Sequence, residues 1–254
     1  MWADLQYRIL KRAFPRGPGF GESTFYIGKS KAEVVLGAGF LKSVAGKTVI
    51  DFGCGEGSEA IEIARSGAER VLGLDYREDV LQIARRKAQE AAVDKICEFT
   101  QSTNEVADII ISIDAFEHFD DPAAILRTMD TLLTPDGSIV AAFGPTWYHP
   151  LGGHSFSIFP WSHLLFCEEA LVRWRSDYRP EGATKFSQVG GGLNQISIRK
   201  FEQVVEDSPF EFASFETVPI RKLRHLHNAW TREFFSALVR CRLVKRKARR
   251  ASTH

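Results

Sequence analysis

The chain has 254 residues, 44% of them hydrophobic and 26% charged, so it is long enough to bury a substantial core in one large domain. Its formal net charge of +1 gives no overall reason to expect nucleic acid as a partner, and no apolar run is long enough to cross a membrane. Cys54, Cys97, Cys167 and Cys241 form no C-x-x-C pair, which argues against a zinc site or a disulfide framework. Because the N-terminus has no signal-peptide pattern, the protein is expected to be cytoplasmic.

The first 45 residues are predicted to form a helical cap. Apolar residues follow a helical spacing from Trp2 to Phe14, and helical character returns from Lys29 to Val44. Between these stretches, Pro15 to Gly21 holds two prolines and three glycines and must be a loop. Gly46 then ends the cap before the first predicted strand.

The stretch from Val49 to Gly57 reads Val-Ile-Asp-Phe-Gly-Cys-Gly-Glu-Gly and precedes a helical pattern from Ser58 to Ala64. A strand, a glycine turn and a helix in this order bring a ligand against bare backbone and a helix N-terminus. The glycines form a G-x-G-x-G pattern, which differs from the G-x-G-x-x-G pattern of dinucleotide sites. Asp51, two residues before the first glycine, would repel a pyrophosphate but suits a ligand that carries ammonium and sulfonium charge.

A second buried strand, Val71 to Asp75, also ends in an acid. A carboxylate at this place can accept hydrogen bonds from both hydroxyls of a ribose, as in dinucleotide folds. The D-x-G-x-G-x-G loop together with this spaced acid resembles the S-adenosylmethionine site of class I methyltransferases. The resemblance implies that the loop cradles the amino-acid end of the cofactor, that Asp75 binds the ribose, and that Tyr76 lies beside the adenine. The candidate cofactor-binding residues are Asp51, Gly53, Cys54, Gly55, Gly57, Asp75, Tyr76, Ser102 and Asp114.

Strands and helices continue to alternate after this point. Following a helix at Asp79 to Ala92, strands are predicted at Ile96 to Gln101, Ala107 to Ile113 and Ser138 to Phe143, with a helix from Pro122 to about Leu133 before the last of them. Five strands that alternate with helices specify a doubly wound parallel sheet. Ligands of such sheets lie outside the carboxyl ends of the strands.

Several of these strand ends carry acids, so the expected pocket is acidic. Asp114 follows the fourth strand and joins Asp51 and Asp75 there. The family commonly has an acid near the adenine after the third strand, but none stands directly at that place in this chain. The polar candidates for the adenine contact are Gln101, Ser102 and Thr103.

The segment from Gly144 to about Gly192 breaks the alternation and is rich in aromatic residues. An insertion of this kind after the fifth strand can form a lid over the cleft. A helix at Ile198 to Val205 follows, and then two strand patterns at Phe210 to Val218 and Glu233 to Val244. The family resemblance implies that these strands are an antiparallel pair on the sheet edge.

The predicted fold is α/β: a Rossmann-like doubly wound sheet that is mostly parallel, with an antiparallel C-terminal strand pair, N-terminal helices and an aromatic lid insertion. One structural domain with four parts is expected: the cap at 1–45, the cofactor-binding core at 46–144, the lid at 145–197 and the C-terminal part at 198–254. The resemblance implies that the N-terminal helices lie over the cofactor cleft. Phe25, Tyr26 and Ile27 are then candidate lid contacts, with core packing as the alternative.

Methyl transfer requires the protein to align the acceptor, remove its proton and keep out water. His118 follows the fourth strand and is the first candidate for the general base, since imidazole titrates near neutral pH. A helix-terminal histidine that is hydrogen-bonded to backbone is the structural alternative. His149 and His154, in the lid, are the next catalytic candidates. Structural or solvated positions are expected for the other histidines considered, which are His163, His225 and His227.

A metal-assisted route would need carboxylates that converge on a hard cation. Asp114, Asp120 and Asp121 are available, but the last two lie at a predicted helix start, where capping explains them. No metal is therefore expected. Nucleic acid is not expected as a substrate either, because the fourth strand lacks the Asn/Asp-Pro-Pro-Tyr/Phe signature of amino-methylating DNA enzymes and no basic stripe lies beside the cleft.

The leading hypothesis is an S-adenosylmethionine-dependent methyltransferase that acts on a small organic acceptor by in-line displacement. O-methylation is favoured over N- or C-methylation. A nicotinamide-dependent oxidoreductase on a similar sheet is one alternative, and a non-catalytic cofactor-binding or scaffold protein of the same fold is another. The oligomeric state stays open.

Basic residues crowd the C-terminus, where a frayed and solvated tail is expected. Contact with an anionic membrane surface or with nucleic acid is the alternative for this tail. The residues are Arg240, Arg242, Lys245, Arg246, Lys247, Arg249 and Arg250.

Overall fold

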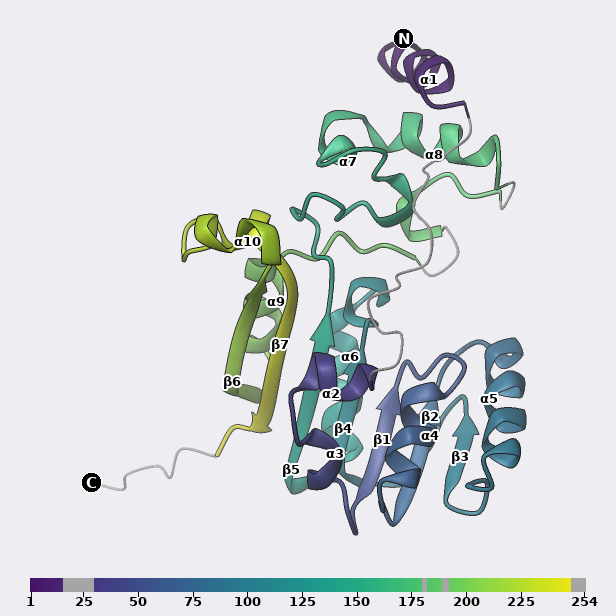
Figure 1. The fold of residues 1–254 in the computed structure, drawn as a ribbon, viewed down its shortest axis with the longest axis vertical. Coiled ribbons are helices and arrows are strands. Elements are labelled where there is room, and N and C mark those ends of the chain that lie inside the picture. The colour runs from purple at the N-terminus through teal and green to yellow at the C-terminus, as the bar shows by residue number, and fades with distance from the viewer. Residues whose placement is uncertain (16–29, 180–181, 189–191, 248–254) are drawn as a thin grey trace.

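The computed structural model describes residues 1–15, 30–179, 182–188 and 192–247. At its centre lies a seven-stranded sheet with the strand order β3-β2-β1-β4-β5-β7-β6 (Figure 1). The first five strands of the chain run parallel, whereas β7 runs antiparallel to β5 and β6. This topology confirms the predicted doubly wound sheet with its antiparallel C-terminal pair. The strands are β1 Thr48–Phe52, β2 Arg70–Leu74, β3 Cys97–Thr100, β4 Ala107–Ile113, β5 Leu133–Phe143, β6 Phe210–Pro219 and β7 Ser236–Lys245.

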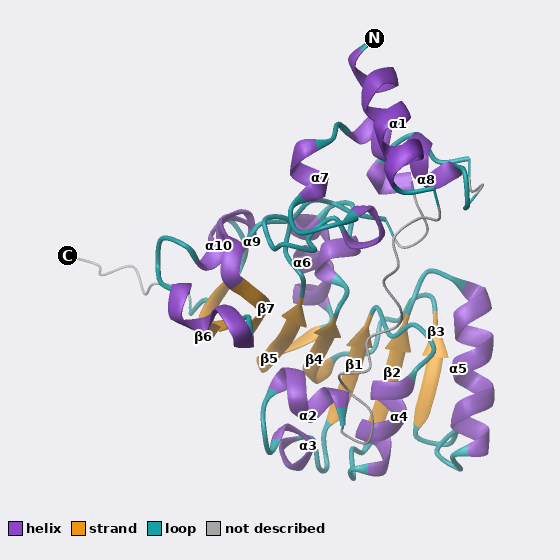
Figure 2. Cartoon of the chain, turned by 45° about the horizontal axis from the view of Figure 1, so that its top comes forward, coloured by secondary structure: helices purple, strands orange, loops and turns teal. Residues whose placement is uncertain are grey.

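Helices cover both faces of the sheet, which explains why its central strands are apolar throughout (Figure 2). In β4 every residue except Asp108 is buried, and the Asp108 carboxylate accepts a hydrogen bond from the Thr48 backbone N–H at 3.0 Å. One face packs against the helices α2 Lys31–Leu36, α3 Phe40–Ser43, α4 Ser58–Arg65 and α5 Glu78–Glu90. The other face packs against α6 Pro122–Thr131 and α9 Ile198–Glu206.

Two element boundaries differ from the prediction for local reasons. The helical stretch expected up to Val44 is split into α2 and α3, because Gly37 and Gly39 adopt φ angles of 112° and 85° between them. The strand β5 begins at Leu133 and not at Ser138, since Leu133 already pairs with Ala107 in β4. The pairing resumes at Ser138 opposite Ile109, so the residues between them form a bulge in β5.

The last strand, β7, begins at Ser236 and not at Glu233, because residues 232–235 form the short helix α10 Arg232–Phe235. The Glu233 carboxylate accepts hydrogen bonds from the backbone N–H groups of Ile198 at 3.0 Å and Arg199 at 2.8 Å. Glu233 therefore satisfies two backbone N–H groups at the start of α9 that have no partner within that helix.

Three of the seven basic C-terminal residues are part of the sheet, so the prediction of a frayed tail is wrong for these three. Arg240 and Arg242 lie in β7, and Arg240 Nε donates to the backbone carbonyl of Val35 at 2.6 Å. Lys245, the last residue of β7, forms a 3.0 Å ion pair with Asp130. These long side chains tie β7 to the helices on either side of the sheet. Arg249 and Arg250 lie outside the described residues.

The insertion after β5 and the helix α1 Trp2–Ala13 form a separate layer beyond the carboxyl ends of the strands (Figure 1). Trp174 is fully buried in this layer and donates from Nε1 to the Phe14 carbonyl at 3.0 Å, while Gln6 Oε1 accepts from the Cys167 N–H at 2.7 Å. The helix α1 therefore packs on the insertion and not on the sheet. The insertion contains η3 His154–Phe156, α7 Ser162–Leu165, α8 Glu168–Ser176 and η4 Phe186–Gln188.

The candidate lid contacts Phe25, Tyr26 and Ile27 lie outside the described residues. Within the described ranges, no helix combines the length and the apolar character that crossing a bilayer requires. Of the histidines, His163 is buried in the insertion and His225 is exposed, as expected. His227 is half-buried and its Nε2 lies 3.2 Å from Thr217 Oγ1 and 3.0 Å from Ser236 Oγ, so it braces the two edge strands and is not solvated.

Candidate functional site

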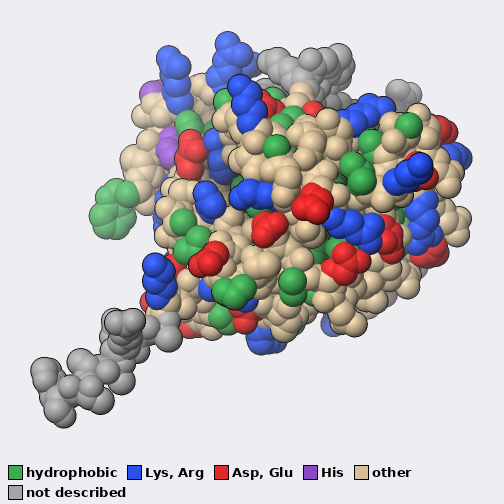
Figure 3. Space-filling view, turned by 90° about the horizontal axis from the view of Figure 1, so that it is seen from below, with side chains coloured by type: hydrophobic (Ala, Val, Ile, Leu, Met, Phe, Trp, Pro, Cys, Tyr) green, Lys and Arg blue, Asp and Glu red, His purple; other side chains and the backbone are tan. Residues whose placement is uncertain are grey.

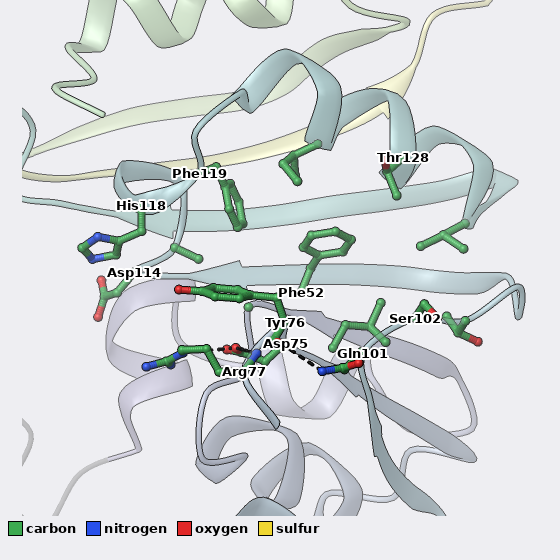
Figure 4. A pocket seen from close by; sticks show the side chains of 16 residues that line it. Phe52, Asp75, Tyr76, Arg77, Gln101, Ser102, Asp114, His118, Phe119 and Thr128 are labelled. Atoms are coloured by element: carbon green, nitrogen blue, oxygen red, sulfur yellow. Dashed lines mark hydrogen bonds and ion pairs between the residues drawn. The ribbon is translucent and has the colours of Figure 1, made fainter. Parts of the chain in front are cut away.

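A pocket of about 370 Å³ opens at the carboxyl ends of the parallel strands (Figure 4). Its walls come from the loops after β1, β2, β3 and β4 and from one side of α6, which is where a doubly wound sheet places a ligand. The residues that line it are Phe52, Gly53, Leu74, Asp75, Tyr76, Arg77, Gln101, Ser102, Thr103, Asp114, Ala115, His118, Phe119, Ile125, Thr128 and Leu132.

The glycine loop is held close to the neighbouring strand by its own backbone. The N–H groups of Gly53 and Cys54 both donate to the Leu74 carbonyl, at 2.8 and 3.0 Å. Gly53, Gly55 and Gly57 all have positive φ, at 86°, 50° and 78°. The loop therefore needs residues without a Cβ for its conformation, before any ligand is considered.

The glycines nevertheless differ in what surrounds them. A Cβ on Gly57 would lie 2.5 Å from the Phe99 ring and 2.9 Å from Ala84 Cβ, so packing alone requires glycine there. A Cβ on Gly55 would meet no protein atom within 4 Å. The space above Gly55 is therefore free of protein atoms, although neither Gly55 nor Gly57 lines the pocket, and the space beside Gly57 is filled by core side chains.

This contrast predicts that two matched substitutions will affect different properties, one mainly stability and the other mainly cofactor binding. Gly57→Ala should lower the free energy of unfolding by about 2 kcal/mol or more, since it combines overpacking with backbone strain. Gly55→Ala should cost only about 1 kcal/mol of strain but should weaken S-adenosylmethionine binding, because its methyl group enters the open space. Thermal unfolding and calorimetric titration of both variants would measure this. Unchanged affinity in Gly55→Ala would contradict the assignment of the loop to the cofactor.

Asp75 links the end of β2 to the glycine loop. Its Oδ2 accepts a hydrogen bond from the Gly55 N–H at 3.0 Å, and its Oδ1 accepts from the Arg77 N–H at 3.0 Å. The Arg77 guanidinium also lies 3.3 Å from Oδ1. These bonds fix the carboxylate at the pocket wall, where Figure 4 places it beside Tyr76 and Arg77.

Asp51 lies beneath the loop and does not line the pocket. It is only 2% exposed, and its Oδ2 has no hydrogen-bond partner among the described residues. Burial, reinforced by the nearby Glu59 carboxylate, raises the pKa of Asp51 well above its ordinary value, although Lys31 acts in the opposite direction. An unpaired buried acid next to the cleft would be stabilised by a cation that entered it.

Lys31 of α2 brings a cation to this group of acids. Its Nζ lies 2.9 Å from Asp114 Oδ2 and 3.5 Å from Glu59 Oε1. Burial by itself lowers the pKa of Lys31, but the two carboxylates outweigh burial and raise it above the ordinary value. Lys31 therefore stays charged, and it brings a cation from α2 to Asp114 at the end of β4.

His118 ends the short helix η2 Phe116–His118 and lines the pocket. Its Nδ1 lies 2.9 Å from the carbonyl oxygen of Gly192, which can only accept, so Nδ1 carries the proton. Nε2 is then the basic nitrogen. Figure 4 shows the ring beside Asp114 at one end of the pocket. A fixed tautomer with one basic nitrogen is the arrangement that a general base requires.

His149 and His154, the other catalytic candidates, do not line this pocket. His149 Nδ1 accepts from the Leu151 N–H at 2.9 Å, and His154 Nε2 donates to the Pro145 carbonyl at 3.3 Å. Burial lowers the pKa of each to about 4, so both are neutral at pH 7. The His154 ring packs edge-on against the His118 ring, with centroids 5.4 Å apart. His154 is therefore a packing neighbour of the candidate base.

Among the residues predicted for the cofactor, the structure brings Gly53, Asp75, Tyr76, Ser102 and Asp114 to one pocket. Cys54 is buried beneath the loop, and burial raises the pKa of its thiol, so it is no nucleophile. Gln101, which was named beside Ser102 for the adenine, donates from Nε2 to the Tyr76 carbonyl at 3.1 Å. That bond joins the loops after β2 and β3.

Sequence reasoning missed the apolar wall of the pocket and Arg77. Phe52, Phe119 and Ile125 come from three different segments and meet only in the fold, with the Phe52 and Phe119 rings edge-to-face at 5.9 Å. Phe52 lies inside the glycine motif, and Arg77 follows Asp75 by two residues. Their closeness in sequence to motif residues could therefore have predicted that they line the pocket. For Phe119 and Ile125 the sequence offers none.

Glu117, the residue before His118 in the chain, is a buried acid. Its Oε1 accepts from the Gly144 N–H at 3.2 Å, whereas its Oε2 has no partner among the described residues. Burial and the nearby Asp114 carboxylate raise the pKa of Glu117 to about 8. Glu117 is thus protonated at neutral pH, and it joins the end of β4 to the start of the insertion.

The raised pKa predicts a pH-dependent stability. Between pH 4.5 and about 8 the folded protein holds a proton on Glu117 that the unfolded chain has released, so this residue makes folding less favourable as the pH rises through that window. The slope is about 1.4 kcal/mol per pH unit. The variant Glu117→Gln cannot titrate, so its stability relative to the wild type should improve steadily from pH 5 to pH 8. Parallel pH profiles in chemical denaturation would contradict this.

Across the described residues, no three His, Cys, Asp or Glu side chains are arranged to hold a metal ion. Metal independence stays a prediction. Two of the acids considered for it have structural partners: Asp121 Oδ1 caps α6 by accepting from the Ala124 N–H at 2.9 Å, and Asp114 pairs with Lys31.

Comparison with known proteins finds matches to the region around the pocket. Residues 43–144 match a family model described as a methyltransferase domain. A ubiquinone biosynthesis O-methyltransferase from Acinetobacter baylyi is 39% identical over 104 residues, which cover 38% of this chain and 43% of that protein. A protein of the same name from Serratia proteamaculans is 35% identical over 99 residues, covering 37% and 41%. The chain thus spans less than half the length of these relatives.

Solved structures resemble a larger part of the chain. An S-adenosylmethionine-dependent methyltransferase from Mesorhizobium loti has a TM-score of 0.53 at 18% identity, covering 85% of this chain and 99% of that one. The cyclase SpnF has a TM-score of 0.53 at 14% identity, covering 80% and 77%. At such identities the likeness concerns the fold, and a fold can serve more than one chemistry.

Proposed function

We propose that this chain, whose residues 43–144 match a methyltransferase domain model, transfers a methyl group from S-adenosylmethionine to a small organic acceptor. The observation that carries the proposal is the Asp75 carboxylate bonded to the Gly55 N–H at a pocket that this glycine loop borders. In this arrangement a ribose can meet an acid while a charged amino-acid end meets bare backbone.

The residues present fit the cofactor in charge and shape. Asp75 would hold the ribose, with Tyr76 and Ser102 on the adenine side. Asp75 and Asp114 line the pocket, and the buried Asp51 beneath the loop would ionise more readily beside a cation, which suits a ligand with ammonium and sulfonium groups. The pocket volume of about 370 Å³ is in the range of small-molecule sites.

When bound, S-adenosylmethionine supplies a methyl group on a sulfonium centre that leaves as a thioether. His118 Nε2 would take the proton of the acceptor hydroxyl as the new oxygen–carbon bond forms, while the Gly192 carbonyl holds the Nδ1 proton and the ring orientation. The insertion reaches this end of the pocket through the Gly192–His118 bond, where it would limit the access of water to the methyl group.

An oxygen acceptor is favoured over nitrogen or carbon for two reasons. A hydroxyl needs a base when it is methylated, and His118 is placed to act as one. Relatives of the domain are O-methyltransferases of ubiquinone biosynthesis by name, although they align with under half of this chain. Because the aligned region covers under half of each relative, the acceptor itself is assigned only as a small organic molecule.

The proposal is tested by incubating the protein with methyl-labelled S-adenosylmethionine and a metabolite extract, followed by mass spectrometry. Labelled product and S-adenosylhomocysteine in equal amounts are expected. Calorimetric titration with S-adenosylmethionine and with a nicotinamide dinucleotide separates the alternatives. Binding of the dinucleotide alone would favour an oxidoreductase, and cofactor binding without any labelled product would favour a non-catalytic protein.

A further inference from the structure

The connection between the two edge strands lies at the same end of the sheet as the pocket. Residues 220–231, here called the edge loop, join the end of β6 to α10 and contain the helix η5 Arg221–Leu226. The start of β7 pairs with the carboxyl end of β5 through Val239 and Phe143. The edge loop therefore projects beyond the sheet beside the insertion, where α10 is labelled in Figure 1.

The edge loop has cations without matching acids. Arg221, Lys222 and Arg224 are exposed, and residues 219–232 contain no Asp or Glu. None of these three takes part in an ion pair with another described residue, whereas Arg232 at the end of the loop pairs with Glu202. On the face shown in Figure 3, acidic and basic side chains are interspersed. The loop is therefore a local positive patch on a chain that is nearly neutral.

The same segment exposes large apolar side chains. Trp230 is 92% exposed and Leu226 is 42% exposed. Phe234 of α10, four residues after Trp230, is 40% exposed, and its ring lies 5.6 Å from that of Tyr148 of the insertion, which is 38% exposed. Large apolar side chains grouped on the surface of a monomer indicate a binding site for another protein or for a membrane. Tryptophan favours the interface between water and lipid in particular.

The loop is held in this conformation by its own hydrogen bonds. Thr231 Oγ1 donates to the Leu226 carbonyl, and the Trp230 N–H donates to Asn228 Oδ1 at 2.9 Å. Below it, Trp161 of the insertion packs edge-on against Phe235 at 6.4 Å. Trp230 is thus presented by an ordered turn, and binding through it would need little further ordering of the backbone.

We propose that the edge loop docks the protein on the surface of an anionic lipid bilayer. Trp230 and Leu226 would enter the headgroup region, and Arg221, Lys222 and Arg224 would meet lipid phosphates. Two-part recognition of this kind, with apolar side chains that insert and cations that meet anionic headgroups, is what holds interfacial segments on membranes. The inference concerns a surface outside the pocket and does not depend on the proposed methyl transfer.

Other occupants fit the observations less well. A second copy of the chain in a two-fold contact would bring two identical sets of three cations together. Nucleic acid would bind the cations and could stack on Trp230, but it would leave Leu226 and Phe234 facing phosphate. A bilayer covers both kinds of side chain at once.

Co-sedimentation of the full chain with vesicles tests the proposal. Binding should be strong to vesicles that contain about one third phosphatidylglycerol, weak to vesicles of phosphatidylcholine alone, and should fall sharply at about 1 M salt. The triple variant Arg221→Gln, Lys222→Gln, Arg224→Gln should bind about 100-fold more weakly, because each basic residue near an anionic surface contributes about fivefold. Trp230→Ala should weaken binding to the same vesicles by at least about tenfold.

Two matched controls keep the test specific. Trp2→Ala removes another exposed tryptophan, on α1, and Arg65→Gln removes an exposed cation on α4; both should bind as the wild type does. Equal binding to neutral and anionic vesicles, or wild-type binding by the triple variant, would overturn the proposal. So would loss of binding in Trp2→Ala alone, dimerisation that Trp230→Ala abolishes without vesicles, or binding of an oligonucleotide but not of vesicles.

Discussion

Replacing His118 with alanine is expected to lower kcat about 10²- to 10⁴-fold while leaving the affinity for S-adenosylmethionine nearly unchanged. The reason is geometric: the Gly192 carbonyl holds the proton on Nδ1, so Nε2 is the basic atom, and the ring lines the pocket beside Asp114. Single-turnover kinetics with labelled cofactor would measure the chemical step, and calorimetry would measure the affinity.

The neighbouring histidine provides the control for this variant. His154 packs on His118 with ring centroids 5.4 Å apart but does not line the pocket, so His154→Ala should reduce kcat far less. Wild-type turnover in His118→Ala would remove it from the role of base, and an equal loss in both variants would indicate a structural role for the pair.

Replacing Asp75 with alanine is expected to weaken S-adenosylmethionine binding about 100-fold or more. Hydrogen bonds to a charged acceptor contribute about 1.5–3 kcal/mol each, and a ribose offers two hydroxyls to this carboxylate. The variant also loses the bonds that Asp75 accepts from the Gly55 and Arg77 N–H groups, which shape the wall of the pocket. Calorimetric titration of the cofactor measures the loss.

Two further variants separate binding from folding. Asp75→Asn keeps the shape and one acceptor oxygen, so its affinity should fall between that of the wild type and that of Asp75→Ala. Asp79→Ala removes an exposed acid in the first turn of α5 and should bind the cofactor normally. Affinity for S-adenosylmethionine that stays unchanged in Asp75→Ala would refute the ribose assignment.

Features that follow from short stretches of chain were predictable. The glycine loop and the spaced acid at Asp75 follow from residue identity and from the ends of two apolar runs. The order of strands and helices through Phe143 also followed from local hydrophobic patterns, because strands buried on both faces are apolar throughout. The start of a strand could not be predicted where a single long-range contact decides it. Glu233 was expected to begin a strand, but its carboxylate caps the start of α9, 35 residues earlier in the chain.

Contacts between distant segments could not be predicted. The ion pair of Lys31 with Asp114 and the bond from His118 to Gly192 each join residues many positions apart, and no period or motif links them. The packing of α1 on α8 is of the same kind, since an amphipathic helix does not specify which apolar surface it will cover.

By itself, the sequence determined the class of sheet, the strand ends at which a ligand would meet acids, and the glycines that leave backbone bare. These depend on the conformations open to single residues and on the burial of short runs. Tertiary structure alone decided which of the three histidines faces the pocket, which cation balances its acids, and where cations and Trp230 share one exposed loop. Such outcomes depend on packing between distant segments, whose free energy no local pattern encodes.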